Sequence, residues 1–128
     1  MNKEVKFFVC EHCGNLVEMV NDSGVPMMCC GQKMTELKPN TTDAAVEKHV
    51  PVVKVEGSQV TVEVSSVQHP MTEEHHIAWV CLQTEKGSQL KYLDPVGKPE
   101  AVFTLEEDKA VKAFAYCNLH GLWVADAK

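Results

Sequence analysis

Four of the six cysteines lie within the first thirty residues, in two pairs. Cys10 and Cys13 form a C-x-x-C-G knuckle, a spacing that lets backbone amides and two thiolates surround one tetrahedral metal ion. Cys29 and Cys30 are adjacent, and adjacent residues of an extended chain point to opposite sides, so the backbone must bend sharply for both sulfurs to reach one ion. Gly31 follows and favours such a bend. The pattern predicts a four-thiolate site with an opened tetrahedral geometry, which suits either iron or zinc.

A second set of side chains with metal-ligand chemistry follows further along the chain. Its members are His49, His69, His75, Cys117 and His120. Each is expected in a loop or at the end of a strand, which is where sandwich folds place their sites. A lone histidine is more often a surface or hydrogen-bonded group, but four of them together with a thiol favour a metal centre. Zinc usually stops at four ligands, so this larger set favours iron.

Three further side chains have suitable chemistry but are assigned no ligand role. His76 follows His75 directly and should face away from it in the strand that begins there. Cys81 lies within an apolar strand, which is typical of a small buried core residue. His12 lies inside the cysteine knuckle, between two stronger ligands.

A polar stretch over residues 37–43, which contains Pro39, is typical of a linker between the two sets. We therefore place a small cysteine-rich domain at residues 1–38 and a larger domain at residues 39–128. A segment as short as the first cannot build a sufficient core by burial alone, so a bound metal is expected to stabilise it.

The second domain is predicted to consist mainly of strands. Valines alternate with polar residues over 60–64, the period of a half-buried strand. Further strands are expected at residues 52–55, 77–82, 90–93 and 101–105, with turn residues between them. The segment 106–116 fits either a helix or a turn followed by a strand from about residue 111, and we favour the strand. One helical turn is expected over 43–48. Short strands at this spacing predict an antiparallel β-sandwich, so the fold class is mainly β.

The chain has 128 residues and a formal net charge of −6. This balance argues against nucleic acid and against anionic membranes as partners, because both require a basic face. No apolar run approaches the roughly 18 residues that span a membrane, and the N-terminus lacks the apolar region and small-residue cleavage site of a signal peptide. We therefore expect a cytoplasmic protein, and a reducing location favours cysteines as metal ligands over structural disulfides.

Three segments around the candidate ligands resemble the superoxide reductase family. They are Glu47-Lys48-His49-Val50-Pro51, His69-Pro70-Met71 with His75 and Trp79 downstream, and Cys117-Asn118-x-His120-Gly121-x-Trp123. The preceding Cys-x-x-Cys and Cys-Cys pattern is similar to the desulforedoxin domain that some members carry. The resemblance covers nearly the full chain and points to the desulfoferrodoxins, the two-iron form of superoxide reductase.

The resemblance implies a desulforedoxin-like iron domain followed by a seven-stranded immunoglobulin-like sandwich, with homodimers as the common state. The first iron would be held by Cys10, Cys13, Cys29 and Cys30. The equatorial ligands of a second iron would be His49, His69, His75 and His120. Its axial ligand would be Cys117, with the sixth position open in the ferrous state. In the family, a glutamate that matches Glu47 can occupy this position of the ferric iron, and a cationic residue beside it matches Lys48.

The implied activity is the one-electron reduction of superoxide to hydrogen peroxide, with a rubredoxin-like protein as external electron donor. The ligand types agree with it, since four neutral imidazoles and one thiolate leave a ferrous site near +1, which attracts an anion. The thiolate also donates electron density to the position opposite. Two other classes stay open: an electron carrier that uses only the four-cysteine iron, and a zinc-binding or iron-storage module. A non-haem oxygenase fits less well, because such sites use two histidines and a carboxylate.

Overall fold

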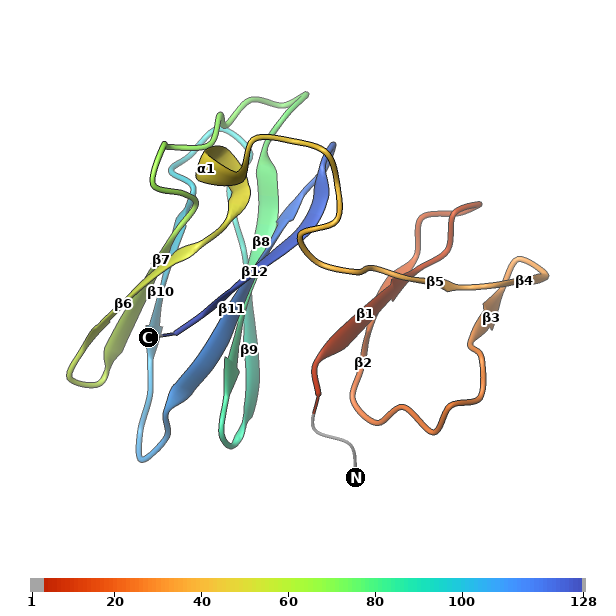
Figure 1. Ribbon diagram of the computed structural model, residues 1–128, viewed down its shortest axis with the longest axis horizontal. Helices are drawn as coiled ribbons and strands as arrows, with labels where there is room; N and C mark the ends of the chain where they lie inside the picture. The colour runs from red at the N-terminus through yellow and green to blue at the C-terminus, as the bar shows by residue number, and fades with distance from the viewer. Residues whose placement is uncertain (1–3, 128) are drawn as a thin grey trace. The chain divides into compact units, whose positions relative to one another are not determined.

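Figure 1 shows the computed structural model, which describes residues 4–127. The chain divides between Lys38 and Pro39 into two compact units. Strands predominate, and the one helix assigned within the described residues, α1 (Val46–His49), is a single turn. Within the same residues, no helix is long and apolar enough to cross a membrane.

The first unit contains a three-stranded sheet and a short hairpin. The sheet has the order β2-β1-β5, from β1 (Lys6–Val9), β2 (Leu16–Met19) and β5 (Thr35–Glu36), and the hairpin joins β3 (Met28–Cys29) to β4 (Gln32–Lys33). Among its described residues, the buried apolar side chains are Phe7, Cys10 and Met34. So small a core agrees with the expectation that a metal ion stabilises this unit.

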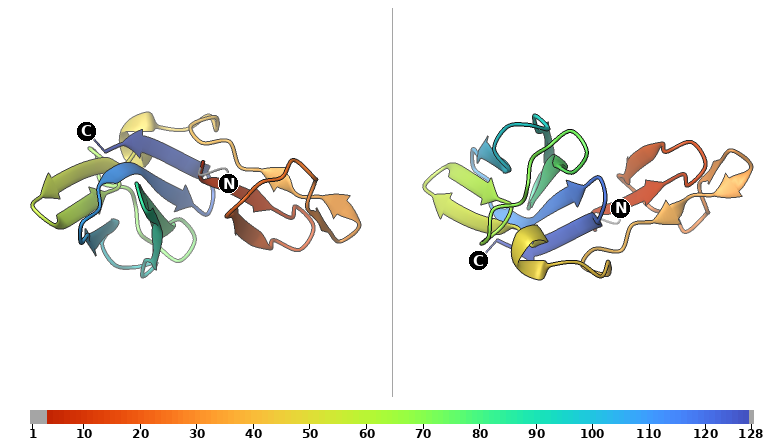
Figure 2. Two further views of the ribbon diagram at one scale, coloured as in Figure 1. Left: turned by 90° about the horizontal axis from the view of Figure 1, so that it is seen from below. Right: turned by 90° about the horizontal axis from the view of Figure 1, so that it is seen from above.

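The second unit is a sandwich of two antiparallel sheets, which Figure 2 shows from two further sides. Its seven described strands are β6 (Val52–Glu56), β7 (Gln59–Glu63), β8 (Ile77–Thr84), β9 (Gly87–Tyr92), β10 (Glu100–Thr104), β11 (Ala110–Cys117) and β12 (Gly121–Asp126). One sheet has the order β10-β7-β6 and the other β12-β11-β8-β9. The predicted fold class, a cysteine-rich unit followed by an antiparallel β-sandwich, is confirmed.

Alternating side chains of both sheets form the core of the sandwich. The core residues are Val60, Val62, Val64, Ile77, Val80, Leu82, Ala101, Phe103, Leu105, Ala113, Ala115 and Cys117. Strict alternation would put Ile77 and Val80 on opposite faces of β8. The pairing register explains why both reach the core, because Ile77 pairs with Cys117 while Trp79 pairs with Tyr116, which leaves Ala78 as an extra residue in a β-bulge. The bulge brings Ile77 to the core face of β8, opposite Cys117 at the end of β11.

The strands β6, β7, β8, β9, β10 and β11 lie where the sequence pattern predicts them, and the segment 106–116 contributes a strand rather than a helix. The strand β12 is not among the strands that the sequence pattern predicts, and its residues directly follow the candidate ligands Cys117 and His120. Gly121 begins β12 with a φ of +78°, which a glycine adopts without strain.

Asn40, near the start of the second unit, lies along the edge of β12. The backbone N–H of Asn40 donates to Leu122 O at 3.0 Å. The Asn40 side chain donates through Nδ2 to Val124 O at 3.1 Å and accepts at Oδ1 from Val124 N–H at 2.9 Å. Asn40 has a φ of +61°, a conformation that asparagine tolerates better than most residues. Its side chain thus takes the place of a neighbouring strand, and the chain then continues to α1.

Truncation of Phe103 should destabilise the second unit strongly. Phe103 is fully buried between the sheets, and such a Phe→Ala change typically costs about 3 to 5 kcal/mol of unfolding free energy. Val102→Ala is the matched control in the same strand, because Val102 is 39% exposed and should lose at most about 1 kcal/mol. Denaturant unfolding of the metal-free protein, followed by tryptophan fluorescence, measures both, since Trp79 and Trp123 lie in this unit. Equal losses in the two variants would contradict the assigned core.

Candidate metal centres

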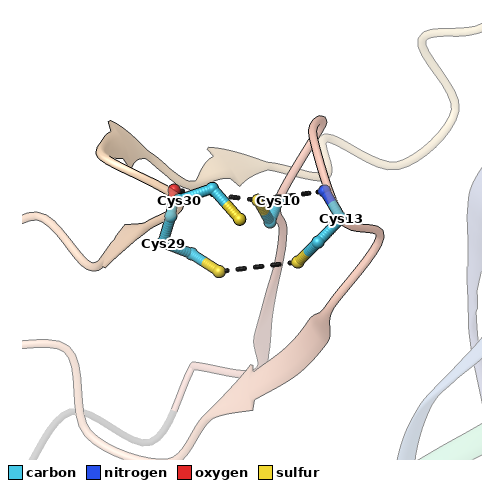
Figure 3. A group of neighbouring side chains, drawn as sticks. All are labelled: Cys10, Cys13, Cys29 and Cys30. Carbon is cyan, nitrogen blue, oxygen red and sulfur yellow. Dashed lines mark hydrogen bonds between the residues drawn. The ribbon is translucent and has the colours of Figure 1, made fainter.

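The four N-terminal cysteines converge on one small volume in the first unit (Figure 3). The Sγ atoms of Cys13 and Cys29 lie 3.6 Å apart, and Cys10 Sγ lies 3.5 Å from the backbone N of Cys13, which donates to it. All four thiols are free of disulfides, and all four sulfur atoms lie within 4.8 Å of one another. The structure therefore brings together the cysteines that the sequence singled out, and His12 is not among the grouped side chains.

The adjacent cysteines lie in a tight hairpin, whose turn allows both sulfur atoms to reach the same site. Cys29 pairs with Gln32 across the hairpin, so Cys30 and Gly31 are the two residues of its turn. Both have positive φ, 53° for Cys30 and 72° for Gly31, as a type I′ turn requires. The sequence indicated a bend with help from Gly31, but it gave no sign that Cys30 itself adopts the left-handed conformation.

The thiols of this cluster cannot all be ionised without a positive charge among them. The backbone N–H of Cys13 lowers the pKa of Cys10 to about 6, despite the opposing effect of burial. In contrast, hydrogen bonding with the neighbouring Cys13 and Cys10 sulfurs raises the pKa of Cys30 to about 12. One thiolate thus suppresses ionisation of the next, and a bound cation is what would allow four thiolates to coexist.

The second cluster lies at one end of the sandwich, where four segments meet. His49 ends α1, His69 and His75 lie in the connection from β7 to β8, and Cys117 ends β11, just before the turn that carries His120. His49, His69 and Cys117 are buried, while His75 and His120 are partly buried. These five residues are the ones that the sequence pattern grouped, and they come together although up to 71 positions separate them.

The four imidazole rings form a closed, nearly square circuit. Neighbouring centroids lie 4.7 Å apart for His49 and His69, 4.6 Å for His69 and His75, 5.0 Å for His75 and His120, and 4.9 Å for His49 and His120. Neighbouring ring planes meet at 76° to 86°, and the diagonal from His49 to His75 is 6.4 Å. The rings therefore surround a common centre in the way that equatorial ligands surround an ion.

Two of these rings have lone pairs that face each other. The Nδ1 atoms of His49 and His69 each lie 2.7 Å from a backbone carbonyl, of Ala45 and Pro70 respectively. A carbonyl only accepts, so each Nδ1 carries the proton and each neutral ring presents an Nε2 lone pair. These two Nε2 atoms are 3.2 Å apart, an arrangement that is unfavourable unless a cation lies between them.

His75 adds a third inward-facing nitrogen. Its Nε2 is buried and has no hydrogen-bond partner, the only buried side-chain nitrogen or oxygen in that condition among the described residues. Buried polar atoms are almost always satisfied, so an orphaned one indicates a ligand. The donor set thus fits a metal ion of the kind that imidazoles bind.

His120 and Cys117 complete the cluster. His120 Nδ1 lies 3.1 Å from His49 Nε2 and 3.9 Å from Cys117 Sγ. Burial raises the pKa of the Cys117 thiol, although the backbone N–H groups of Leu119 and His120 act in the opposite direction. Those N–H groups are oriented to stabilise a thiolate once a cation offsets the cost of burial.

Trp123 supports the cluster from the side. Its ring stacks on His49 at 4.8 Å between centroids with 26° between the planes, and its Nε1–H donates to His120 O at 3.1 Å. In the sequence, Trp123 is recognised only as part of a motif. No sequence pattern indicates that the carbonyls of Ala45 and Pro70 accept hydrogen bonds from the histidines.

The remaining sequence candidates lie around the cluster rather than within it. His76 Nδ1 lies 2.9 Å from Thr72 O, so this ring is directed to its own loop. Glu47 and Lys48 are exposed on α1, next to His49. The charge of Lys48 contributes to lowering the pKa of both His49 and His75, after burial and the neighbouring histidines. Cys81 is fully buried in β8, as predicted.

Family models match both units of the chain. The model described as desulfoferrodoxin matches residues 41–126, and the model described as the desulfoferrodoxin N-terminal domain matches residues 2–37.

Known proteins similar to this chain carry related names. A desulfoferrodoxin from Nitratidesulfovibrio vulgaris is 44% identical over 99% of this chain and 100% of its own length. A superoxide reductase from Pyrococcus horikoshii is 44% identical over 60% of this chain and 83% of its own length. The crystal structure of the superoxide reductase from Treponema pallidum superposes with a TM-score of 0.82 and 45% identity, over 96% of this chain and 99% of that one.

Acidification should destabilise the metal-free second unit. Burial is the main cause that lowers the pKa of His49 and His75, and it lowers that of His69 from 6.5 to about 4. The unfolded chain therefore binds protons that the folded chain excludes, so the free energy of unfolding should fall as the pH drops from 6.5 towards about 4. Thermal unfolding across this range measures it. His69→Gln should weaken the pH dependence, whereas His12→Gln, in the other unit, should leave it unchanged.

Proposed function

Because the chain belongs to the desulfoferrodoxin family and carries the two iron centres of that family, we propose that it is a superoxide reductase. The reaction is the reduction of superoxide to hydrogen peroxide at the histidine-cysteine centre. The first iron is assigned to Cys10, Cys13, Cys29 and Cys30. The second iron is assigned to His49, His69, His75, His120 and Cys117.

The observation that carries this proposal is the square of four imidazole rings around a common centre, with a buried thiol beside it. A ring of four nitrogens plus a sulfur exceeds the four donors of structural zinc sites. It matches a metal with five protein ligands and one remaining position for a small molecule. Neither an electron carrier nor a storage module requires such a position.

The reaction balances with one electron and two protons for each superoxide that becomes hydrogen peroxide. Iron held by these residues would supply the electron, and an external donor would restore it after each turnover. The chain's own part is to hold four neutral imidazoles and one thiolate in place, which leaves the ferrous site near +1. The thiolate of Cys117, supported by the N–H groups of Leu119 and His120, increases the electron-donating power of the site.

Two exposed residues of α1 are assigned roles at the open side of the centre. Lys48 provides a positive charge whose field reaches the cluster, so it should attract the superoxide anion. Glu47 is held by its backbone, since Glu47 O accepts from Val67 N–H at 2.8 Å. Its carboxylate would bind the iron in its oxidised state.

The proposal also covers the electron donor, the cellular location and the oligomeric state. The external donor is a rubredoxin-like protein, the chain acts in the cytoplasm, and the functional unit is a homodimer. Family membership supports the proposed donor and homodimer, and cysteines that are free of disulfides support the proposed location.

The product of a single exposure to superoxide tests the proposed activity. Anaerobically reduced protein that receives a known dose of superoxide should form peroxide without releasing dioxygen. Cys117→Ser should lose this reaction, because a serine hydroxyl replaces the electron-donating thiolate. Cys81→Ala is the matched control, since it removes a buried thiol of the same sheet that lies outside the centre, and it should react like the unaltered protein. Dioxygen evolved alongside peroxide would indicate dismutation, and no reaction at all would favour an electron carrier.

Neutralising Lys48 should slow the encounter with superoxide. Lys48→Ala removes a positive charge beside the centre, so the second-order rate constant should fall about 2- to 10-fold at low salt and depend less on ionic strength. Pulse radiolysis measures this constant directly. Glu47→Ala is the matched control, because it removes a charge of opposite sign from the same exposed turn and should not slow the encounter. An equal decrease in both variants would contradict electrostatic attraction by Lys48.

A further inference from the structure

Asn118 joins the segment that carries His75 to the turn that connects Cys117 with His120. Its backbone N–H donates to His76 O at 3.1 Å. Its side chain accepts at Oδ1 from His76 N–H at 2.9 Å and donates through Nδ2 to Glu74 O at 3.0 Å. These bonds attach the residues on both sides of His75 to the turn that follows β11.

The ring of His75 is positioned differently from the rings of His49 and His69. Those two rings are each oriented by their own Nδ1, which donates to a carbonyl at 2.7 Å. The backbone of His75 is held instead: Thr72 N–H donates to His75 O at 2.9 Å, and His75 N–H donates to Thr72 Oγ1 at 3.1 Å. The Nε2 of His75 has no partner. The position of this ring therefore depends on where the segment 72–76 is held.

We propose that Asn118 is a positioning residue of the histidine-cysteine centre, which fixes His75 relative to Cys117 and His120. Its side chain binds backbone atoms on both sides of His75 and is not itself a ligand. Without these side-chain bonds, the segment 72–76 keeps its internal turn and the backbone bond from Asn118 N–H to His76 O, but it loses the two side-chain bonds at Glu74 and His76. One corner of the square of imidazoles then becomes free to move, and the affinity of the centre for iron falls.

This inference rests on the proposed metal centre but not on the reaction with superoxide. Its test therefore uses iron alone. Wild-type protein that binds a single iron, at the cysteines, would contradict the proposed function. Wild-type protein that binds two irons while the Asn118 variant matches it would contradict only the role of Asn118.

The test is a competition for ferrous iron between a chelator and the full chain, with each centre followed separately by its absorption after oxidation. In Asn118→Ala, the affinity of the histidine-cysteine centre should fall about 10- to 100-fold, the usual effect of removing a residue that orients metal ligands. The four-cysteine centre of the same molecules serves as an internal reference and should retain its iron unchanged. The absorption band of the ferric histidine-cysteine centre should also shift, which a purely structural role for Asn118 would not cause.

Asn40→Ala is the matched control. Asn40 is also an exposed asparagine whose amide group bonds to backbone atoms of another segment of the second unit, in this case both of those of Val124. Its removal should lower the unfolding temperature, yet leave the iron affinity of both centres unchanged. Equal losses of iron from the two variants would show that Asn118 acts only through general stability and would overturn the proposal.

A second variant keeps the test decisive if Asn118→Ala does not fold. Asn118→Asp retains the acceptor for His76 N–H but loses the donor to Glu74 O. It should reduce the affinity by a smaller factor, measured at high salt to screen the added charge. An affinity equal to that of the wild type in the folded variant would likewise overturn the proposal.

Discussion

Buried imidazole nitrogens that face one another need a cation between them, and the second unit is arranged around that need. The carbonyls of Ala45 and Pro70 fix the protons of His49 and His69 on the outer nitrogens, so the inner nitrogens meet as lone pairs 3.2 Å apart. In water the same nitrogens would be hydrated or protonated. The folded chain thus keeps the donors dehydrated and aligned, and the binding energy of the metal offsets that cost.

The sandwich makes this alignment possible because it supplies rigid strand ends close together. Cys117 is a core residue of β11 that faces Ile77 across the β-bulge, so the sulfur is fixed by packing rather than by loop contacts. The histidines are carried on shorter, partly exposed segments, and each needs its own restraint. These restraints are backbone carbonyls for His49 and His69, the stacked ring of Trp123 for His49, and the link through Asn118 for His75.

Features encoded by short-range patterns could be predicted from the sequence, and features that depend on distant partners could not. The strands β7 and β8 follow from alternating or continuous apolar residues, and the four-cysteine set follows from residue type and local spacing. The histidine-cysteine set comes from distant segments and was grouped by residue type and by the resemblance of its three segments to a known family. The left-handed conformation of Cys30 could not be predicted, because it is imposed by the pairing of β3 with β4 rather than by the residue. The same holds for β12, which is defined by its pairing with β11.

The hydrogen bonds of Asn40 also limit how copies of this chain can associate. The outer edge of β12 would otherwise present free N–H and carbonyl groups, and such an edge is a template for another strand. At Val124 both groups are already bound to the Asn40 side chain. Addition of a strand at this edge would therefore first have to displace the Asn40 side chain from Val124. Asn40 thus hinders the addition of further strands to the β12 edge beside the metal centre. Charged residues or prolines commonly have this role at sheet edges, but here an asparagine has it.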